Sequence, residues 1–134
     1  MVDPATLQRI MNDPYTHFLG ATLEAVEAGY CRVSLVVTPQ MLNFHHITHG
    51  GIIFSLGDIA FAAAGNSAGQ KAVALNVTVS FLRPTGAGDH LIAEAREVET
   101  VGSTALYEIT VTESKSSQLV ARFQALAHRR HSQT

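Results

Sequence analysis

Hydrophobic and polar residues alternate along six stretches of the chain, with the period of a strand that has one buried face. The stretches cover residues 19–25, 31–37, 73–81, 91–95, 105–111 and 119–127. The first two are joined by Glu27-Ala28-Gly29-Tyr30, and this link predicts a β-hairpin. The links between the last four are short and rich in turn-forming residues, so they favour an antiparallel meander.

Residues 50–66 follow helical spacing instead. One apolar stripe contains Ile52, Ile53, Leu56, Ile59, Ala60 and Ala63. The opposite stripe contains Gly51, Phe54, Ser55, Asp58, Phe61, Ala62 and Gly65. Because this second stripe is also small and apolar, we expect a helix that is buried nearly all round. A shorter helix is expected over residues 4–12, and Pro14 is expected to end it.

One long helix among about six antiparallel strands predicts an α+β domain whose sheet curves round the helix. The chain contains no repeat and no linker, so residues 1–134 are predicted to form a single domain. Residues 1–14 would be a short N-terminal helical extension, and residues 129–134 a disordered polar tail. A sheet of six strands has two open edges, which favours pairing with a second copy of the chain.

Composition excludes several classes of function. The net charge is −2, so the chain lacks the excess of basic residues that nucleic-acid binding requires. Cys31 is the only cysteine, which excludes a disulfide framework; we expect it to be a buried small hydrophobic residue rather than a reactive thiol. Residues 1–16 do not resemble a signal peptide, and residues 52–64 are too short and too interrupted to span a membrane. A cytoplasmic protein with no membrane contact is expected.

Asp58 is the candidate catalytic residue. It is the only ionisable residue between His49 and Lys71, and its helical neighbours are small or apolar. Burial of an unpaired carboxylate is unfavourable, and the same burial makes a carboxylate a usable base or nucleophile. The alternative is a solvent-facing Asp on an amphipathic helix, although Lys and Glu, which usually occupy such a face, are absent here.

His49-Gly50-Gly51 opens the long helix with two residues that carry no side chain. Exposed N–H groups at a helix start can bind a developing oxyanion or a phosphate. The alternative is a start that needs unusual backbone angles or close packing. Gly50 and Asp58 are separated by about 12 Å along a helix, too far to act on one carbonyl. A two-fold partner would have to bring Gly50 of one chain to Asp58 of the other.

Other polar residues are weaker candidates. Asn43 can donate its amide to a carbonyl oxygen or simply fix the loop. The histidines at 45, 46 and 49 lack the spacing and the further ligands of a metal site, so no metal is expected. Asn76 lies on the strand predicted over residues 73–81, and Arg83 follows it. They could form a plain outward polar face, or they could bind a long polar ligand, with Arg83 pairing with a phosphate.

Asn43, His49-Gly50-Gly51, Asp58 and Phe81-Leu82-Arg83-Pro84 occur in an order and spacing that resembles the hotdog-fold thioesterases. The string from Met41-Leu42-Asn43 to Phe54-Ser55-Leu56 is most similar to the PaaI-type, phenylacetate-pathway branch. The resemblance covers roughly residues 15–130. The chain departs from it at Gly57, where a larger residue is common, and at Ala74 and Leu75, where some relatives carry a hydroxyl.

The resemblance implies a curved sheet wrapped round one helix, dimers with continuous sheets and commonly tetramers. It implies hydrolysis of acyl-CoA thioesters without a cofactor, most specifically of aryl-acyl-CoA such as phenylacetyl-CoA or its hydroxylated derivatives. Asp58 would be nucleophile or general base, and the Gly50 N–H would polarise the thioester carbonyl. Asn43 and His49 would assist from the neighbouring subunit. Gly51, Asn76 and Arg83 are the expected substrate-binding residues.

Two other functions remain open at this stage. One is a non-catalytic module that binds acyl-CoA. The other is a hotdog-fold dehydratase or hydratase of hydroxyacyl thioesters, in which His49 or His46 would have to be the base.

Overall fold

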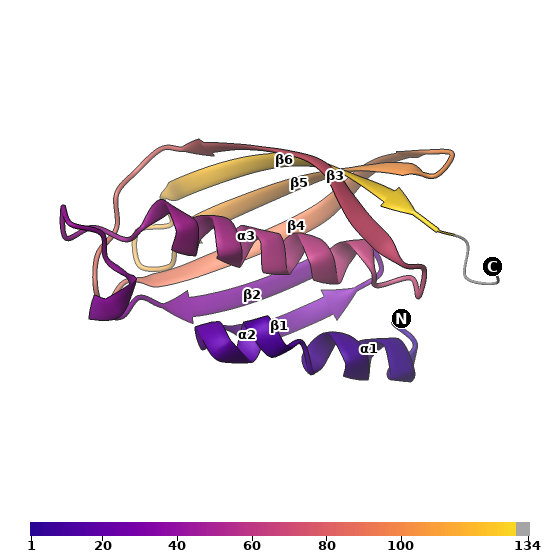
Figure 1. The fold of residues 1–134 in the computed structure, drawn as a ribbon, viewed down its shortest axis with the longest axis horizontal. Helices are drawn as coiled ribbons and strands as arrows, with labels where there is room; N and C mark the ends of the chain where they lie inside the picture. The colour runs from indigo at the N-terminus through magenta and orange to yellow at the C-terminus, as the bar shows by residue number, and fades with distance from the viewer. Residues whose placement is uncertain (131–134) are drawn as a thin grey trace.

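The computed structural model describes residues 1–130, which form one curved sheet and three α-helices (Figure 1). In chain order the elements are α1 (Pro4–Met11), α2 (Pro14–Leu19), β1 (Thr22–Glu27), β2 (Tyr30–Val36), the 3-10 turn η1 (Pro39–Met41), α3 (Gly50–Gly65), β3 (Ala72–Phe81), β4 (His90–Val101), β5 (Thr104–Glu113) and β6 (Leu119–Arg129). The predicted α+β architecture, with six strands and one long helix, is confirmed. None of the helices in this part of the chain is both long enough and apolar enough to cross a membrane.

The sheet is antiparallel throughout, in the order β1-β2-β4-β5-β6-β3. The predicted β1–β2 hairpin is present, and Gly29 allows its turn through a positive φ of 71°. The predicted meander holds for β4, β5 and β6 only. β3 pairs with β6 at the far edge, so residues 82–89 return across the end of the sheet to start β4.

The N-terminus contains more helix than the sequence predicted. Pro14 does end α1, but it also begins α2, because Asp13 caps the new helix through the Thr16 N–H and proline is favoured in a first helical turn. Gly20 ends α2 with a positive φ of 81°. The extension therefore continues to Leu19 rather than ending at residue 14, and the first strand starts later than predicted.

α3 lies across the inner side of the sheet, where it covers the strands from β2 to β6 (Figure 1). The residues of the helix that enter the core include Ile53, Leu56, Ala60 and Ala64. They meet alternate residues of the strands, such as Val33, Leu91, Ile109 and Phe123. Cys31 is fully buried among them, as predicted, and burial raises the pKa of its thiol to about 12.

β3 contains a β-bulge between Ala74 and Asn76. A bulge adds one residue to a strand and reverses which side chains face each side. Val77 and Val79 therefore pack toward the core, while Val73 and Leu75 are 49% and 58% exposed at the free edge of the sheet. The single alternation predicted over residues 73–81 is wrong at this point.

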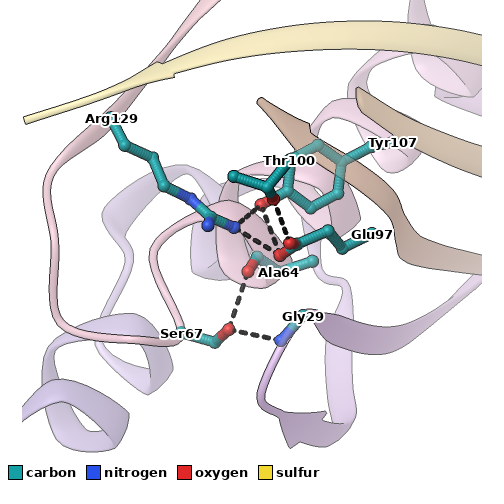
Figure 2. A network of polar contacts seen from close by, with 7 residues as sticks. All are labelled: Gly29, Ala64, Ser67, Glu97, Thr100, Tyr107 and Arg129. Carbon is teal, nitrogen blue, oxygen red and sulfur yellow. Dashed lines mark hydrogen bonds and ion pairs between the residues drawn. The ribbon is translucent and has the colours of Figure 1, made fainter. Parts of the chain in front are cut away.

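Polar contacts hold the C-terminal end of α3 against the sheet (Figure 2). The Ser67 hydroxyl donates to the Ala64 carbonyl at 2.7 Å and accepts the Gly29 N–H at 2.8 Å, which ties the helix end to the first hairpin. Beside it, the Arg129 guanidinium contacts both the Glu97 carboxylate and the phenol of Tyr107. Thr100 donates to the same carboxylate.

The disordered tail was predicted to start at residue 129, which is too early. Arg129 belongs to β6, and its N–H donates to the Ser103 carbonyl at 2.8 Å. The Arg130 N–H donates to the Lys71 carbonyl at 2.8 Å. The rest of that prediction, residues 131–134, lies outside the described residues.

Candidate active site

Asp58 lies in the middle of α3, on the side of the helix that the sheet does not cover. With Gly51, Phe54 and Ala62 it forms an exposed stripe at helical spacing. The prediction that α3 is buried nearly all round is therefore wrong for the single chain. The stripe holds one carboxylate among three uncharged residues, an arrangement that suits a ligand or a second subunit.

The Asp58 carboxylate has no hydrogen-bond donor within residues 1–130. Partial burial raises its pKa, and the negative charge of Asp13 in the N-terminal extension raises the pKa further. A carboxylate with no partner and a raised pKa is a stronger base than an exposed, paired one. These are the properties of a catalytic carboxylate rather than of a helix-stabilising one.

A crevice of about 150 Å³ opens beside Asp58, between α3 and β3. Its walls are mostly small side chains and glycine, together with one aromatic ring: Phe61, Ala62, Gly65, Asn66, Ala72, Val73, Ala74 and Ala127. The Phe61 ring is buried and packs edge-on against Tyr107, with 5.3 Å between ring centroids. The crevice therefore has one fixed aromatic wall and a narrow, apolar interior.

Gly57 allows the helix to approach the sheet closely. A Cβ atom on Gly57 would lie 2.4 Å from the Phe123 ring, which no side chain at this position could avoid. The same ring packs against Phe54 of the exposed stripe, with 5.8 Å between centroids. The departure from the family pattern at Gly57 thus has a steric reason, namely the phenylalanine at 123.

The first turn of α3 leaves one backbone donor free. The Ile52 and Ile53 N–H groups donate to the His49 carbonyl, and the Gly51 N–H donates to the His49 ring at 2.8 Å. Within the described part of the chain, the Gly50 N–H has no acceptor. The Gly50 N–H is therefore free within residues 1–130, whereas the Gly51 N–H is used inside the chain, and the binding roles predicted for both stay predictions.

His49 is the N-cap of α3, and this contact assigns its tautomer. Nδ1 accepts the Gly51 N–H, so the ring proton must be on Nε2. The ring can then donate from Nε2, but it has no free nitrogen that could accept a proton while the cap is intact. Nε2 is therefore the ring nitrogen that remains for a ligand, and the assisting role predicted for His49 stays a prediction.

Asn43 organises the loop that leads to His49. Its side-chain oxygen accepts the N–H groups of His45, at 2.9 Å, and Ile47, at 3.4 Å. Loop fixing is therefore confirmed, and the side-chain amide nitrogen is still free to donate. His46 adopts a positive φ of 62°, and no group of three potential metal ligands occurs among residues 1–130.

Asn76 and Arg83 do not join Asp58 within one chain. Asn76 lies beyond the bulge, on the same face as Thr78 and Ser80, which is the outer face of the sheet away from α3. Arg83 is exposed and donates to the Leu119 carbonyl at 2.8 Å, so part of its guanidinium supports the backbone. The bulge turns Asn76 to the outer face, away from Asp58 of the same chain, and the substrate-binding role predicted for Asn76 stays a prediction.

Sequence reasoning missed Tyr15 and Ser55 as neighbours of the site. The Tyr15 hydroxyl lies 2.8 Å from the Ser55 hydroxyl, one helical turn before Asp58. Tyr15 also lines an open hollow with His49 and Gly51. The Asp13-Pro14 pair was the available signal, because it predicts the start of a helix that carries Tyr15.

Sequence comparison connects these features with known proteins. A family model described as the thioesterase superfamily matches residues 45–120, more than half of the chain. The acyl-coenzyme A thioesterase PaaI of Escherichia coli K12 is 42% identical over 118 residues, which are 88% of this chain and 84% of that protein.

Comparison with solved structures leads to the same family. The E. coli PaaI protein from the phenylacetic acid degradation operon superposes with a TM-score of 0.90 at 37% identity, over 98% of this chain and 97% of that one. The protein smu.793 of Streptococcus mutans UA159, bound to acetyl CoA, superposes with a TM-score of 0.78 at 28% identity, over 82% and 88% of the two chains. The resemblance to the PaaI-type branch is confirmed: the chain belongs to the thioesterase superfamily, as a hotdog-fold enzyme that hydrolyses thioesters.

Proposed function

We propose that this enzyme hydrolyses acyl-CoA thioesters in the cytoplasm and prefers aryl-acyl groups such as phenylacetyl or its hydroxylated derivatives. The observation that carries the proposal is the pair of unsatisfied groups on α3, the Gly50 N–H and the Asp58 carboxylate. CoA as the carrier is supported by the acyl-coenzyme A thioesterase of E. coli and by the acetyl CoA bound to smu.793.

The two groups supply complementary chemistry. The Gly50 N–H donates to the thioester oxygen as negative charge develops there. Asp58 either takes a proton from the attacking water or attacks the carbonyl carbon itself, giving an anhydride that water then cleaves. In both routes the C–S bond breaks, the thiolate leaves and is protonated, and the products are a free acid and CoA. Asn43 would assist with its free amide N–H and His49 with its Nε2–H.

The aryl preference rests on the crevice beside Asp58. A cavity of about 150 Å³ lined by apolar side chains is the size that holds one benzene ring. Phe61 supplies an aromatic wall, and the residues of β3 that line the crevice are small. A long fatty-acyl chain exceeds this volume, whereas the phenyl ring of a phenylacetyl group matches it.

We further propose that the smallest active species is a dimer and that the dimers associate into a tetramer. Gly50 and Asp58 lie on one continuous helix, about 12 Å apart, so two chains are needed to bring both to one carbonyl. The free edge of β3 exposes Val73 and Leu75, and the uncovered stripe of α3 lies nearby across the crevice. Joining two β3 edges would cover these surfaces.

A substrate panel tests the reaction. Purified protein is mixed with phenylacetyl-CoA, a hydroxylated phenylacetyl-CoA, acetyl-CoA and palmitoyl-CoA, and CoA release is followed with a thiol dye. We expect the highest kcat/KM with the aryl substrates. Absence of CoA release with every substrate would reject hydrolysis, and saturable binding without turnover would indicate a binding module. Hydration of crotonyl-CoA would indicate dehydratase chemistry, and His49 would then have to give up its cap on the Gly51 N–H to act as the base.

Light scattering coupled to gel filtration tests the assembly. The wild-type chain should show no monomer at micromolar concentration, and Leu75→Lys should shift it toward monomer with loss of turnover. Val36→Lys is the matched control, because Val36 is similarly exposed but belongs to β2, an interior strand. A wild-type monomer with full activity would reject the shared site.

A further inference from the structure

The N-terminal extension approaches the site from outside the region that the family model covers. That region is residues 45–120, whereas Tyr15 belongs to α2 and reaches Ser55 of α3 through a hydroxyl contact of 2.8 Å. Tyr15 is held in place by its helix, which is capped by Asp13 at one end and by Gly20 at the other. Its ring also stacks on Phe18, with 6.1 Å between centroids. Tyr15 is therefore a positioned side chain rather than a loosely attached one.

Tyr15 and Ser55 line an open hollow of about 390 Å³ that reaches the start of α3. His49 and Gly51, on either side of the free Gly50 N–H, also line it. A ligand in this hollow would thus lie next to the group that is proposed to bind the thioester oxygen. The hollow is separate from the crevice beside Asp58, because the two have no lining residue in common.

The lining of the hollow combines two kinds of groups. Met41, Leu42 and Ile52 are apolar. Tyr15, Ser55, Gln40 and His49 present hydroxyl, amide and imidazole groups that donate or accept hydrogen bonds. In the Tyr15–Ser55 pair only one hydroxyl proton lies between the two oxygens, so the other is free to donate to a carbonyl oxygen.

This mixture matches one part of an acyl-CoA. The pantetheine arm alternates amide groups with short methylene stretches, so it needs both apolar contact and neutral hydrogen-bonding groups. The nucleotide would require cations for its phosphates, and none of the described residues lining the hollow is Lys or Arg. An aryl group would need no polar partners and already has the crevice.

We propose that this hollow is the binding site for the pantetheine arm, and that Tyr15 positions the arm by hydrogen bonding to one of its amides. The N-terminal extension would then contribute to recognition of the thiol carrier rather than of the acyl group. This inference rests on the proposed hydrolysis of acyl-CoA.

Thioesters that share one acyl group but differ in the thiol test the inference. Phenylacetyl esters of CoA, of pantetheine and of 2-mercaptoethanol, which has no amide, are compared in the wild-type chain and in Tyr15→Phe. Loss of one neutral hydrogen bond should lower kcat/KM about 5-fold for the CoA and pantetheine esters and leave the mercaptoethanol ester unchanged. Free pantetheine should likewise inhibit Tyr15→Phe about 5-fold less well, while inhibition by phenylacetate stays the same.

Tyr30→Phe is the matched control, because the Tyr30 hydroxyl donates to Glu94 on the sheet and does not line the hollow. It should leave all three esters and both inhibitors unchanged. An equal loss on all three esters in Tyr15→Phe would show that Tyr15 only supports α3, and would overturn the inference. So would unchanged values throughout, or weaker inhibition by phenylacetate in Tyr15→Phe. A wild-type chain that hydrolyses none of the esters would instead reject the proposed function.

Discussion

Polar groups around the C-terminal end of α3 are paired, whereas two polar groups in its first turn and middle are not. At the C-terminal end, Ser67 bonds both the helix and the first hairpin, and Arg129, Glu97 and Tyr107 contact one another (Figure 2). At the other end and in the middle, the Gly50 N–H and the Asp58 carboxylate have no partner within residues 1–130.

Folding alone explains only the first pattern. Pairing polar groups stabilises a fold, whereas unpaired groups at a partly buried position reduce its stability. Unpaired groups that persist are therefore expected where function needs them. The surroundings of the C-terminal end of α3 are built for stability, and its first turn and middle for chemistry.

Asp58→Asn should have the largest effect. The amide keeps the size of the side chain but is neither nucleophile nor base, so kcat should fall at least about 100-fold. The melting temperature should stay the same or rise, because a carboxylate with an unfavourable environment is removed. Asp89→Asn is the matched control, since the Asp89 side chain accepts only the Gly86 N–H in a turn. Full activity in Asp58→Asn would reject the mechanism.

Gly57→Ala, in the interior of α3, should lower the free energy of unfolding more than the other helix substitutions considered. The added methyl group overlaps the Phe123 ring, and we expect a loss of about 2 kcal/mol in the free energy of unfolding. Phe123→Leu in the same chain should recover part of the loss, as a double-mutant cycle in urea would show. Gly65→Ala is the control: its methyl group would make only ordinary contacts, the nearest at 3.6 Å, so stability should hold or increase.

Glu97→Gln should weaken the sheet beside the C-terminal end of α3 without affecting chemistry. It removes the charged partner of Arg129, whose Nε is already buried without a partner among the described residues. We expect a loss of about 1–2 kcal/mol in stability and an unchanged kcat. Glu108→Gln breaks the more exposed pair with Arg122 and should cost less than about 1 kcal/mol. Equal effects of the two substitutions would contradict a special role for the Glu97 cluster.

The smallest effect is an opposite pH dependence of the contributions that Glu97 and Asp58 make to stability. Burial alone would raise the pKa of Glu97, but hydrogen bonds from Thr100 and Arg129 outweigh it and lower the pKa. The contribution of Glu97 is therefore complete above the ordinary pKa of a glutamate and is lost as the pH falls through the lowered value. For Asp58 the pKa is raised, so its unfavourable contribution grows as the pH rises from the ordinary value through the raised one.

Urea unfolding between about pH 3 and 7 measures both contributions. The stability gained by Asp58→Asn should be present at neutral pH and disappear in acid. The stability lost in Glu97→Gln should also disappear in acid, because the wild-type carboxylate is then protonated. A gain in Asp58→Asn that is independent of pH would contradict the assignment of the raised pKa.

Local elements were predictable because their signals are local. The start of α3 follows from two glycines after His49, and its length follows from an apolar spacing that continues to Gly65. The first hairpin follows from alternation on both sides of Gly29. Asp58 was identifiable as a candidate because it is the only ionisable residue in that helix.

Other features depended on contacts between distant parts of the chain. Nothing local to β3 says that it pairs with β6 rather than with β4, or that a bulge turns Asn76 to the outer face. The reason for a glycine at 57 is a ring that lies 66 positions later, at Phe123. Tyr15 meets Ser55, 40 positions away in the sequence, only because the fold brings α2 to the side of α3.

The sequence by itself determined the α+β architecture, the long helix and its single carboxylate, because periodicity and capping act over a few residues and specify elements one at a time. Only the tertiary structure decided which strand edge stays open, which face of α3 remains uncovered and which backbone donor stays free. Those depend on how the elements pack together, and packing is a property of pairs of surfaces that no single stretch of the chain contains.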